Sequence, residues 1–225
     1  MIAIDGPAGS GKTTVAVRLA DRLGAVFLDT GQLYRAVTVL ALRDGLEISE
    51  SDGLAERIAN GAIEISPASV DDGRACDVLL QGADVTTQLR APEVDRNVSA
   101  WSAVPSIRAA LLPIQRNFAR NRRVVMVGRD IASVIFPDAA VKIYLDASLD
   151  ERARRRFRDL YDTHPALTLA DVESDLKRRD EIDSSRETAP LEVADGAIVV
   201  DTNGKSIEAV VDEVAAIAER RWQPA

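Results

Sequence analysis

Near the start of the chain, one run of residues has the types and spacing needed to bind phosphate: Gly6-Pro7-Ala8-Gly9-Ser10-Gly11-Lys12-Thr13. In the pattern G-x-x-x-x-G-K-[ST], glycines let the backbone curl so that successive N–H groups point at phosphate oxygens. Lys12 would reach the β- and γ-phosphates of a nucleoside triphosphate, and the Thr13 hydroxyl would ligate Mg2+. An apolar run precedes the motif and an amphipathic stretch follows it, at residues 1–4 and 15–23. This strand–loop–helix context predicts a phosphate-binding loop.

Arginines elsewhere in the chain indicate a second phosphate site. Arg129 and Asp130 directly follow an apolar run at residues 124–127, and parallel α/β sheets bind their ligands where the strands end. Arg35 lies one turn into the helix predicted after the second strand, and Arg179 lies in a charged helical stretch. Guanidinium groups bind phosphate bidentately and keep their proton. Positioning and cationic stabilisation are what phosphoryl transfer asks of a protein, so this set favours transfer to a phosphate acceptor.

A dense arginine cluster occupies residues 152–158, and two interpretations of it remain open. Its members are Arg152, Arg154, Arg155, Arg156 and Arg158. The cluster could stabilise the charge of a transferred phosphoryl group. It is equally typical of a solvated helix face, paired with neighbouring acidic residues at Asp150, Glu151 and Asp159.

The elements needed to position these residues alternate between strand and helix patterns. Short apolar runs predict buried strands at residues 1–5, 25–28, 124–127, 141–145 and 197–200. Helical patterns separate them, and this alternation predicts an α/β fold with a doubly wound parallel sheet. Capping-box patterns predict helix starts at Ser148-Leu149-Asp150-Glu151 and Thr168-Leu169-Ala170-Asp171. From residue 62 to 90 short strand patterns and turn residues predict a small β-rich insert.

Composition and charge limit the classes of function. The chain has 225 residues and a net charge of −8, from 36 acidic and 28 basic residues. Proteins that bind nucleic-acid polymers are usually basic, so the charge favours small nucleotides as partners. The single histidine, His164, lies in a polar stretch that we interpret as a loop, and the single cysteine is Cys76. Neither a zinc cluster nor an internal disulfide is therefore expected.

The lengths of the apolar runs and the position of the phosphate loop indicate where in the cell the protein is expected. Each is shorter than a membrane span, and the phosphate loop begins too close to residue 1 to leave a signal peptide. We therefore expect a cytoplasmic protein with no membrane contact. The apolar face of the last helix is what packing on its own sheet requires, so we expect a monomer.

The functional patterns combine in one order along the chain: Ile4-Asp5-Gly6-Pro7-Ala8-Gly9-Ser10-Gly11-Lys12-Thr13, Leu28-Asp29-Thr30-Gly31 with Tyr34-Arg35, Gly128-Arg129-Asp130-Ile131, Phe136-Pro137-Asp138-Ala139, and Arg178-Arg179-Asp180 through Arg186. Together they resemble bacterial cytidylate kinases, which are P-loop nucleoside monophosphate kinases, and the resemblance runs nearly end to end. It implies ATP-dependent, Mg2+-assisted phosphorylation of CMP and dCMP by direct in-line transfer. It also implies a P-loop kinase core at residues 1–61 and 104–225, a helical lid around 152–175, and a CMP-binding insert at 62–103.

Matching positions imply roles for individual residues. ATP binding falls to Gly6, Pro7, Ala8, Gly9, Ser10, Gly11, Lys12, Thr13, Thr14 and Arg155, with Thr13 at the metal. CMP binding falls to Thr30, Tyr34, Arg35, Ser99, Arg108, Arg129, Asp130, Arg179, Asp183 and Arg186. The expected catalytic residues are Lys12, Arg129, Arg155 and Arg179.

Within the CMP set, the resemblance implies a division of labour. The cytosine contacts are Thr30, Ser99, Arg108 and Asp130. The monophosphate contacts are Arg35, Arg129 and Arg179, while Asp183 and Arg186 lie at the sugar and its neighbouring phosphate. The chemistry agrees, because the exocyclic amine of cytosine suits a carboxylate acceptor and its N3 and O2 atoms suit donors.

The sequence departs from the family pattern at two positions, and two alternative functions remain open. Val127 stands where the family often has an acidic residue, and Ala132 stands where glycine is usual, which leaves the magnesium environment open. Another small P-loop kinase, with UMP, AMP or shikimate as acceptor, is one alternative. A GTPase-like switch is the other, but such proteins need an Asn-Lys-x-Asp stretch after a late strand, and the sequence has none.

Overall fold

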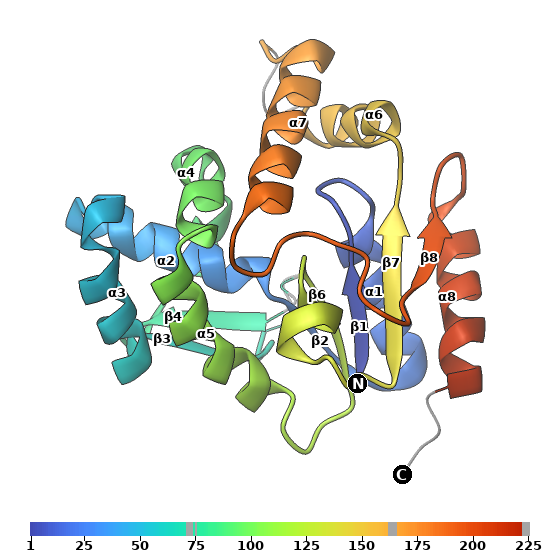
Figure 1. The fold of residues 1–225 in the computed structure, drawn as a ribbon, viewed down its shortest axis with the longest axis horizontal. Coiled ribbons are helices and arrows are strands. Elements are labelled where there is room, and N and C mark those ends of the chain that lie inside the picture. The colour runs from blue at the N-terminus through green and yellow to red at the C-terminus, as the bar shows by residue number, and fades with distance from the viewer. Residues whose placement is uncertain (71–73, 75, 162–165, 222–225) are drawn as a thin grey trace.

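The central element is a five-stranded parallel sheet with strand order β2-β6-β1-β7-β8 (Figure 1). Its strands are β1 Ile2–Asp5, β2 Val26–Asp29, β6 Val124–Val127, β7 Val141–Asp146 and β8 Ile198–Asp201. The structure is a computed structural model and describes residues 1–70, 74, 76–161 and 166–221. The predicted α/β fold with a parallel sheet is confirmed, and each predicted strand lies within about a residue of its observed bounds.

Helices cover both faces of this sheet (Figure 1). The α-helices of the structure are α1 Lys12–Leu23, α2 Gly31–Asp44, α3 Ser51–Arg57, α4 Pro92–Ser102, α5 Pro105–Phe118, α6 Leu149–Leu160, α7 Leu169–Ser185 and α8 Ile207–Arg221. Proline opens α4 and α5, where its missing N–H would have had no helical partner. Within the described residues, no helix is long and apolar enough to cross a membrane.

Alternation along β1 directs its side chains into two different apolar clusters, one on each face of the sheet. Ile2 and Ile4 pack with the apolar faces of α1 and α8, whereas Ala3 packs on the opposite side with α2 and α5. Strands buried on both faces are expected in a parallel sheet that helices cover on both sides. The same alternation turns residue 5 towards the α2 and α5 side.

A second, antiparallel sheet of three strands lies beside α2 and α5 (Figure 1). It consists of β3 Ile63–Pro67, β4 Cys76–Leu80 and β5 Ala83–Asp84. Ile63, Val78 and Leu80 join the same apolar cluster as α2. The predicted β-rich segment is thus present, except that residues 71–73 and 75 lie outside the described residues. The division of the chain into domains stays a prediction.

Helices α6 and α7 pack against each other above the carboxyl ends of the sheet strands (Figure 1). The capping box that begins α7 is confirmed, because Thr168 and Asp171 exchange side-chain and backbone hydrogen bonds. At α6 only half of the predicted box forms: Ser148 accepts from the Glu151 N–H, but the Glu151 carboxylate binds Arg155. Part of the expected lid, including His164, and the end of the last predicted helix lie outside the described residues.

Candidate active site

The phosphate loop joins β1 to α1 in a conformation that requires glycine. Gly6 has φ 146°, and a Cβ there would lie 2.1 Å from the Leu145 carbonyl oxygen. Gly11 has φ 91° and directly precedes the first turn of α1. Substitution at either position would be strained, since residues with a Cβ rarely adopt such φ values. The backbone N–H groups that open α1 therefore face the loop, as an anion site requires.

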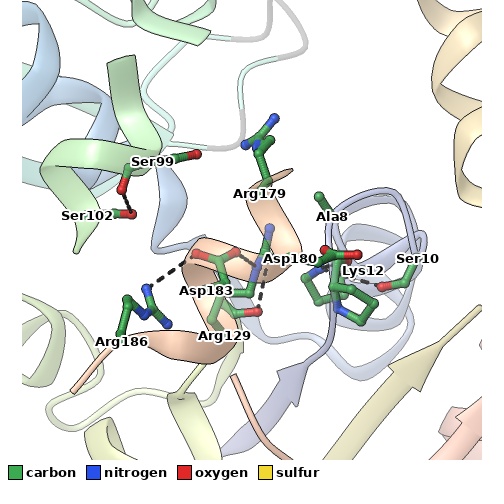
Figure 2. A network of polar contacts seen from close by, with 12 residues as sticks. Ala8, Ser10, Lys12, Ser99, Ser102, Arg129, Arg179, Asp180, Asp183 and Arg186 are labelled. Carbon is green, nitrogen blue, oxygen red and sulfur yellow. Dashed lines mark hydrogen bonds and ion pairs between the residues drawn. The ribbon is translucent and has the colours of Figure 1, made fainter. Parts of the chain in front are cut away.

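Lys12 is buried within this loop. Its Nζ donates to the Pro7 carbonyl oxygen at 2.7 Å and lies 3.5 Å from Ser10 Oγ (Figure 2). Burial lowers the pKa of Lys12 well below its usual value, and the charge of Arg129 lowers it further. A bound polyphosphate would act against both effects and raise the pKa of Lys12, because opposite charge favours the protonated amine.

Thr13 and Asp29 form an oxygen pair beside the loop. The Thr13 hydroxyl donates to Asp29 Oδ2 at 2.9 Å, and Asp29 Oδ1 accepts from the Gly31 N–H at 2.9 Å. Asp29 ends β2, so its carboxylate lies at the same edge of the sheet as the phosphate loop. Its place in the sequence motif was noted, but its role beside Thr13 is visible only in the structure.

A cleft next to the loop brings together every residue expected to bind CMP. Its empty space, including the mouth that opens to solvent, is about 550 Å3. The lining residues are Asp29, Thr30, Gly31, Tyr34, Arg35, Val98, Ser99, Ser102, Arg108, Gly128, Arg129, Asp130, Arg179, Asp183 and Arg186. They come from β2, α2, α4, α5, α7 and the turn after β6, elements that are far apart in the sequence.

A run of alternating charges lies along the cleft. Arg129 Nε donates to Asp183 Oδ2 at 2.8 Å, and Asp183 Oδ1 lies 3.5 Å from Arg186 Nη1. Figure 2 shows Asp183 and Arg129 between Arg186 and Lys12. The Nε atom of Arg186 is buried and, among the described residues, has no hydrogen-bond partner. Asp183 keeps its charge despite burial, since its arginine neighbours lower its pKa.

Arg179 is the arginine of this set with the weakest carboxylate partner. Its nearest acidic oxygen among the described residues, on Asp175, is 4.0 Å away. Burial lowers the pKa of Arg179, and the charges of Arg129 and Arg35 lower it further. The guanidinium groups of Arg179 and Arg129 thus lie close enough to repel each other, and Arg179 has little neutralising negative charge nearby. Such an arrangement favours a bound anion.

The end of the cleft nearest Arg186 contains a buried ion pair. Arg108 of α5 and Asp130 are hydrogen-bonded, and their side chains are 6% and 5% exposed. Arg108 also donates to the Ser102 carbonyl oxygen at 2.9 Å and lies 5.3 Å from the centre of the Tyr34 ring. Ser99 is buried beside this pair on α4. This end therefore offers fixed donors and acceptors in an otherwise enclosed space.

Thr30 and Arg35 have protein partners in this structure. The Thr30 hydroxyl donates to the Val127 carbonyl oxygen at 3.0 Å. Arg35 donates to Asp95 Oδ1 at 2.6 Å and to the Leu89 carbonyl oxygen at 2.8 Å. Sequence reasoning missed Asp95, because nothing in the local pattern of α4 distinguishes it from other exposed carboxylates.

The arginines of α6 have different environments, and the solvated-face interpretation describes only some of them. Arg154 is exposed and pairs with Asp150, as on a solvated helix face. Arg152 is buried and donates to the Ala8 carbonyl oxygen of the phosphate loop at 3.0 Å, while also pairing with Asp180 of α7. It anchors the start of α6 on the loop, a role that helical spacing could not reveal.

Arg155 lies on the other side of the phosphate loop from the cleft. Its guanidinium donates to Thr202 Oγ1 at 3.0 Å and to the Thr202 carbonyl oxygen at 2.6 Å. A Cβ built on Gly11 would lie 3.9 Å from it. Of the expected catalytic residues, the structure thus brings Lys12, Arg129 and Arg179 together and places Arg155 apart from the cleft.

Comparison with known proteins identifies the family. A model of the cytidylate kinase family matches residues 2–220. The cytidylate kinase of Carboxydothermus hydrogenoformans is 44% identical over 220 residues, which cover 98% of this chain and 97% of the relative. The cytidylate kinase of Caldanaerobacter subterraneus subsp. tengcongensis is 43% identical over 213 residues, 95% of this chain and 92% of the relative. A solved structure of an uncharacterized Eubacterium ventriosum protein shares only the fold, with a TM-score of 0.52, 15% identity and 98% coverage of each chain. Because the family match spans nearly the whole chain and contains both the phosphate loop and the charged cleft, this chain belongs to the cytidylate kinase family.

Proposed function

We propose that the chain transfers the γ-phosphoryl group of ATP to CMP and dCMP, giving CDP and dCDP. The observation that carries the proposal is the junction of the phosphate loop with the cleft, where Arg129 is close enough to lower the pKa of Lys12. A donor phosphate on the loop and an acceptor phosphate at Arg129 would meet between these cations. Positioning and charge stabilisation of this kind account for most catalysis of phosphoryl transfer.

The monophosphate of CMP would bind at Arg35, Arg129 and Arg179. One of its oxygens attacks the γ-phosphorus in line, a new P–O bond forms, and the bond to the β,γ-bridging oxygen breaks to release ADP. No general base is needed, since a phosphate monoester has its second pKa near 6 and is ionised at neutral pH. Lys12 would leave the Pro7 carbonyl oxygen and follow the charge that develops on the transferred group.

The base would be read at the enclosed end of the cleft. A carboxylate oxygen of Asp130 accepts a hydrogen bond from the exocyclic amine of cytosine, while Ser99 and Arg108 donate to its N3 and O2 atoms. Uracil presents a carbonyl oxygen in place of the amine. This oxygen and the Asp130 carboxylate would both be acceptors, so no hydrogen bond would form between them. Arg186, with its unpartnered buried Nε, would donate to the sugar side of the nucleotide, and the Asp183 carboxylate would accept from a sugar hydroxyl.

The oxygen pair of Thr13 and Asp29 suits Mg2+. The two oxygens are 2.9 Å apart, and Mg2+ prefers oxygen ligands, usually taking one or two from the protein and the rest from phosphates and water. We propose that Thr13 ligates the ion and that Asp29 orients the Thr13 hydroxyl or a bound water. The ion would supply charge neutralisation between the β- and γ-phosphates.

The donor nucleotide would lie between the loop and Arg155, under the lid formed by α6 and α7. Closure of the lid would exclude water and suppress hydrolysis of ATP. We propose that the chain acts as a monomer, because the apolar face of α8 is buried on its own sheet, and that it does so in the cytoplasm.

The test is a coupled assay of nucleoside-diphosphate formation with ATP, Mg2+ and a panel of CMP, dCMP, UMP, AMP, GMP and shikimate. We expect CMP and dCMP to exceed the others in kcat/KM by at least tenfold, or about 1.4 kcal/mol of transition-state discrimination. Lys12→Ala should lower kcat by about 10²–10³, as does loss of a key donor to a developing oxyanion. A different preferred acceptor would leave the phosphate loop assignment intact and refute the assignment of the base-reading residues.

A further inference from the structure

Asp5, the last residue of β1, holds the turn that carries the acceptor-site residues. Its carboxylate is almost completely buried, with the residue 2% exposed. Oδ1 accepts from the Ile131 N–H at 2.9 Å, and Oδ2 accepts from the Ala132 N–H at 2.8 Å. These donors open the short helical turn Ile131–Ile135, directly after Arg129 and Asp130.

The same strand also holds the beginning of this segment. The Gly128 N–H donates to the Ile4 carbonyl oxygen at 3.1 Å. Arg129 and Asp130 therefore lie between one backbone bond to β1 and two bonds to the Asp5 carboxylate. The side chains that reach the phosphate end and the base end of the cleft are thus oriented from both sides by the end of β1.

The buried charge of Asp5 is unfavourable for folding. Among the described residues, no lysine or arginine nitrogen forms an ion pair with it within 4.0 Å. Burial raises the pKa of Asp5 to about 6, although the two backbone bonds act in the opposite direction. Burial of a carboxylate costs free energy that hydrogen bonds and opposite charge must offset, and here the two backbone bonds provide most of that compensation. An asparagine of the same shape would accept only one of the two N–H groups and direct its own amide hydrogens at the other.

We propose that Asp5 is a positioning residue that links the donor and acceptor sites. It directly precedes Gly6 of the phosphate loop, and its carboxylate holds the turn that follows Arg129 and Asp130. Through this turn it orients both of these side chains. The inference rests on the proposed function of the cleft. It assigns to Asp5 no contact with substrate. Its loss should therefore weaken CMP binding while the loop, which is built from its own backbone, still binds ATP.

The first test compares wild type, Asp5→Asn and the control Asp146→Asn. Asp146 ends the neighbouring strand β7 and accepts one backbone bond, from Ala147, but is exposed. We expect Asp5→Asn to raise KM for CMP by about tenfold or more, with KM for ATP changed less than about twofold, as loss of a hydrogen bond to a charged acceptor predicts. Asp146→Asn should leave both KM values unchanged.

A purely structural role would give a different result. If Asp5→Asn loses stability in urea unfolding but keeps its KM for CMP, or if both KM values rise together, the inference is wrong. Failure of the proposed function is separable, because it would appear in the wild type as a preference for another acceptor. The same KM comparison would then be made with that acceptor, since Arg129 would still require positioning.

A second measurement does not depend on the variant folding. Binding of cytidine to the wild type is followed by calorimetry from pH 7.5 to 5, since cytidine has no phosphate that titrates in this range. The charged or titratable groups that face Asp5 are Asp130, Lys12 and Tyr144. Protonation of Asp5 removes one acceptor, so affinity should fall several-fold as the pH drops through about 6, and Asp5→Asn, where it folds, should lack this fall. Wild-type affinity that is constant over this range would overturn the inference.

Discussion

Removal of one member of the buried Arg108–Asp130 pair should destabilise the protein severely. The two side chains are 6% and 5% exposed, and breaking a buried ion pair costs about 3–5 kcal/mol because it leaves an uncompensated charge. In Asp130→Ala, Arg108 keeps its 2.9 Å bond to Ser102 and its contact with Tyr34. We therefore expect a loss near the lower end, about 3 kcal/mol, from a total stability of about 5–15 kcal/mol.

A double-mutant cycle tests this reasoning. Arg108→Met and Asp130→Ala are each unfolded in urea, together with the double variant. If buried charge is the cause, the double variant should lose about as much as one single variant, because no unpaired charge remains, and the coupling energy should reach about 2 kcal/mol or more. Additive losses, or a loss below about 1 kcal/mol in Asp130→Ala, would refute the argument.

The cycle needs a control pair and a functional readout. The exposed pair of Arg18 and Glu208 joins α1 to α8, and Arg18→Met should leave the urea midpoint almost unchanged, since exposed ion pairs contribute little. In assays below the melting temperature, Asp130→Ala should raise KM for CMP far more than KM for ATP. Equal effects on both substrates would contradict the assignment of Asp130 to the acceptor.

Three further predictions concern other buried positions. Gly128→Ala should lower the melting temperature and raise KM for CMP, because its Cβ would lie 2.6 Å from Ile131 Cδ1 and overpacking costs about 1–3 kcal/mol. The control is Gly53→Ala, whose Cβ meets no atom within 4 Å and which should not lower the melting temperature. Burial raises the pKa of the Cys76 thiol to about 12, so a thiol reagent at pH 8 should modify the protein only as it opens, and rapid labelling of the native protein would contradict this. Burial also raises the pKa of Asp5 from 3.8 to about 6, so the folded state binds this proton more tightly than the unfolded state. The wild type should therefore lose stability as the pH rises from about 4 to 6. Urea midpoints of Asp5→Asn should lack this loss, and identical pH profiles for the two proteins would exclude it.

Several parts of the site were predictable because they depend on local rules. The glycines at positions 6 and 11 occupy φ values that other residues avoid, so the motif itself implies the loop conformation. Arg129 and Asp130 directly follow an apolar strand, and the end of a parallel strand is where such sheets bind ligands. Proline at a helix start is a local signal of the same kind, and it opens both α4 and α5, which supply Ser99 and Arg108.

The partners of these residues were not predictable, because they depend on the path of the chain between distant segments. Arg35 pairs with Asp95 across 60 positions, and Arg129 pairs with Asp183 across 54. The arginine cluster of α6 shows the same limit: helical spacing gives each member a face, but only tertiary packing buries Arg152 against the phosphate loop and directs Arg155 to Thr202.

The elements and the phosphate loop follow from the amino-acid sequence alone, since backbone conformation and hydrophobic period are local properties, whereas the full acceptor set also needed the resemblance to cytidylate kinases. Only the tertiary structure decided which charges neutralise one another and which remain available for an anion. Asp5 is the clearest case: its sequence neighbours place it at a strand end, yet its hydrogen-bond partners are 126 and 127 positions away. Their contact exists because β1 and β6 are adjacent in the sheet, and strand order is a property of the whole fold.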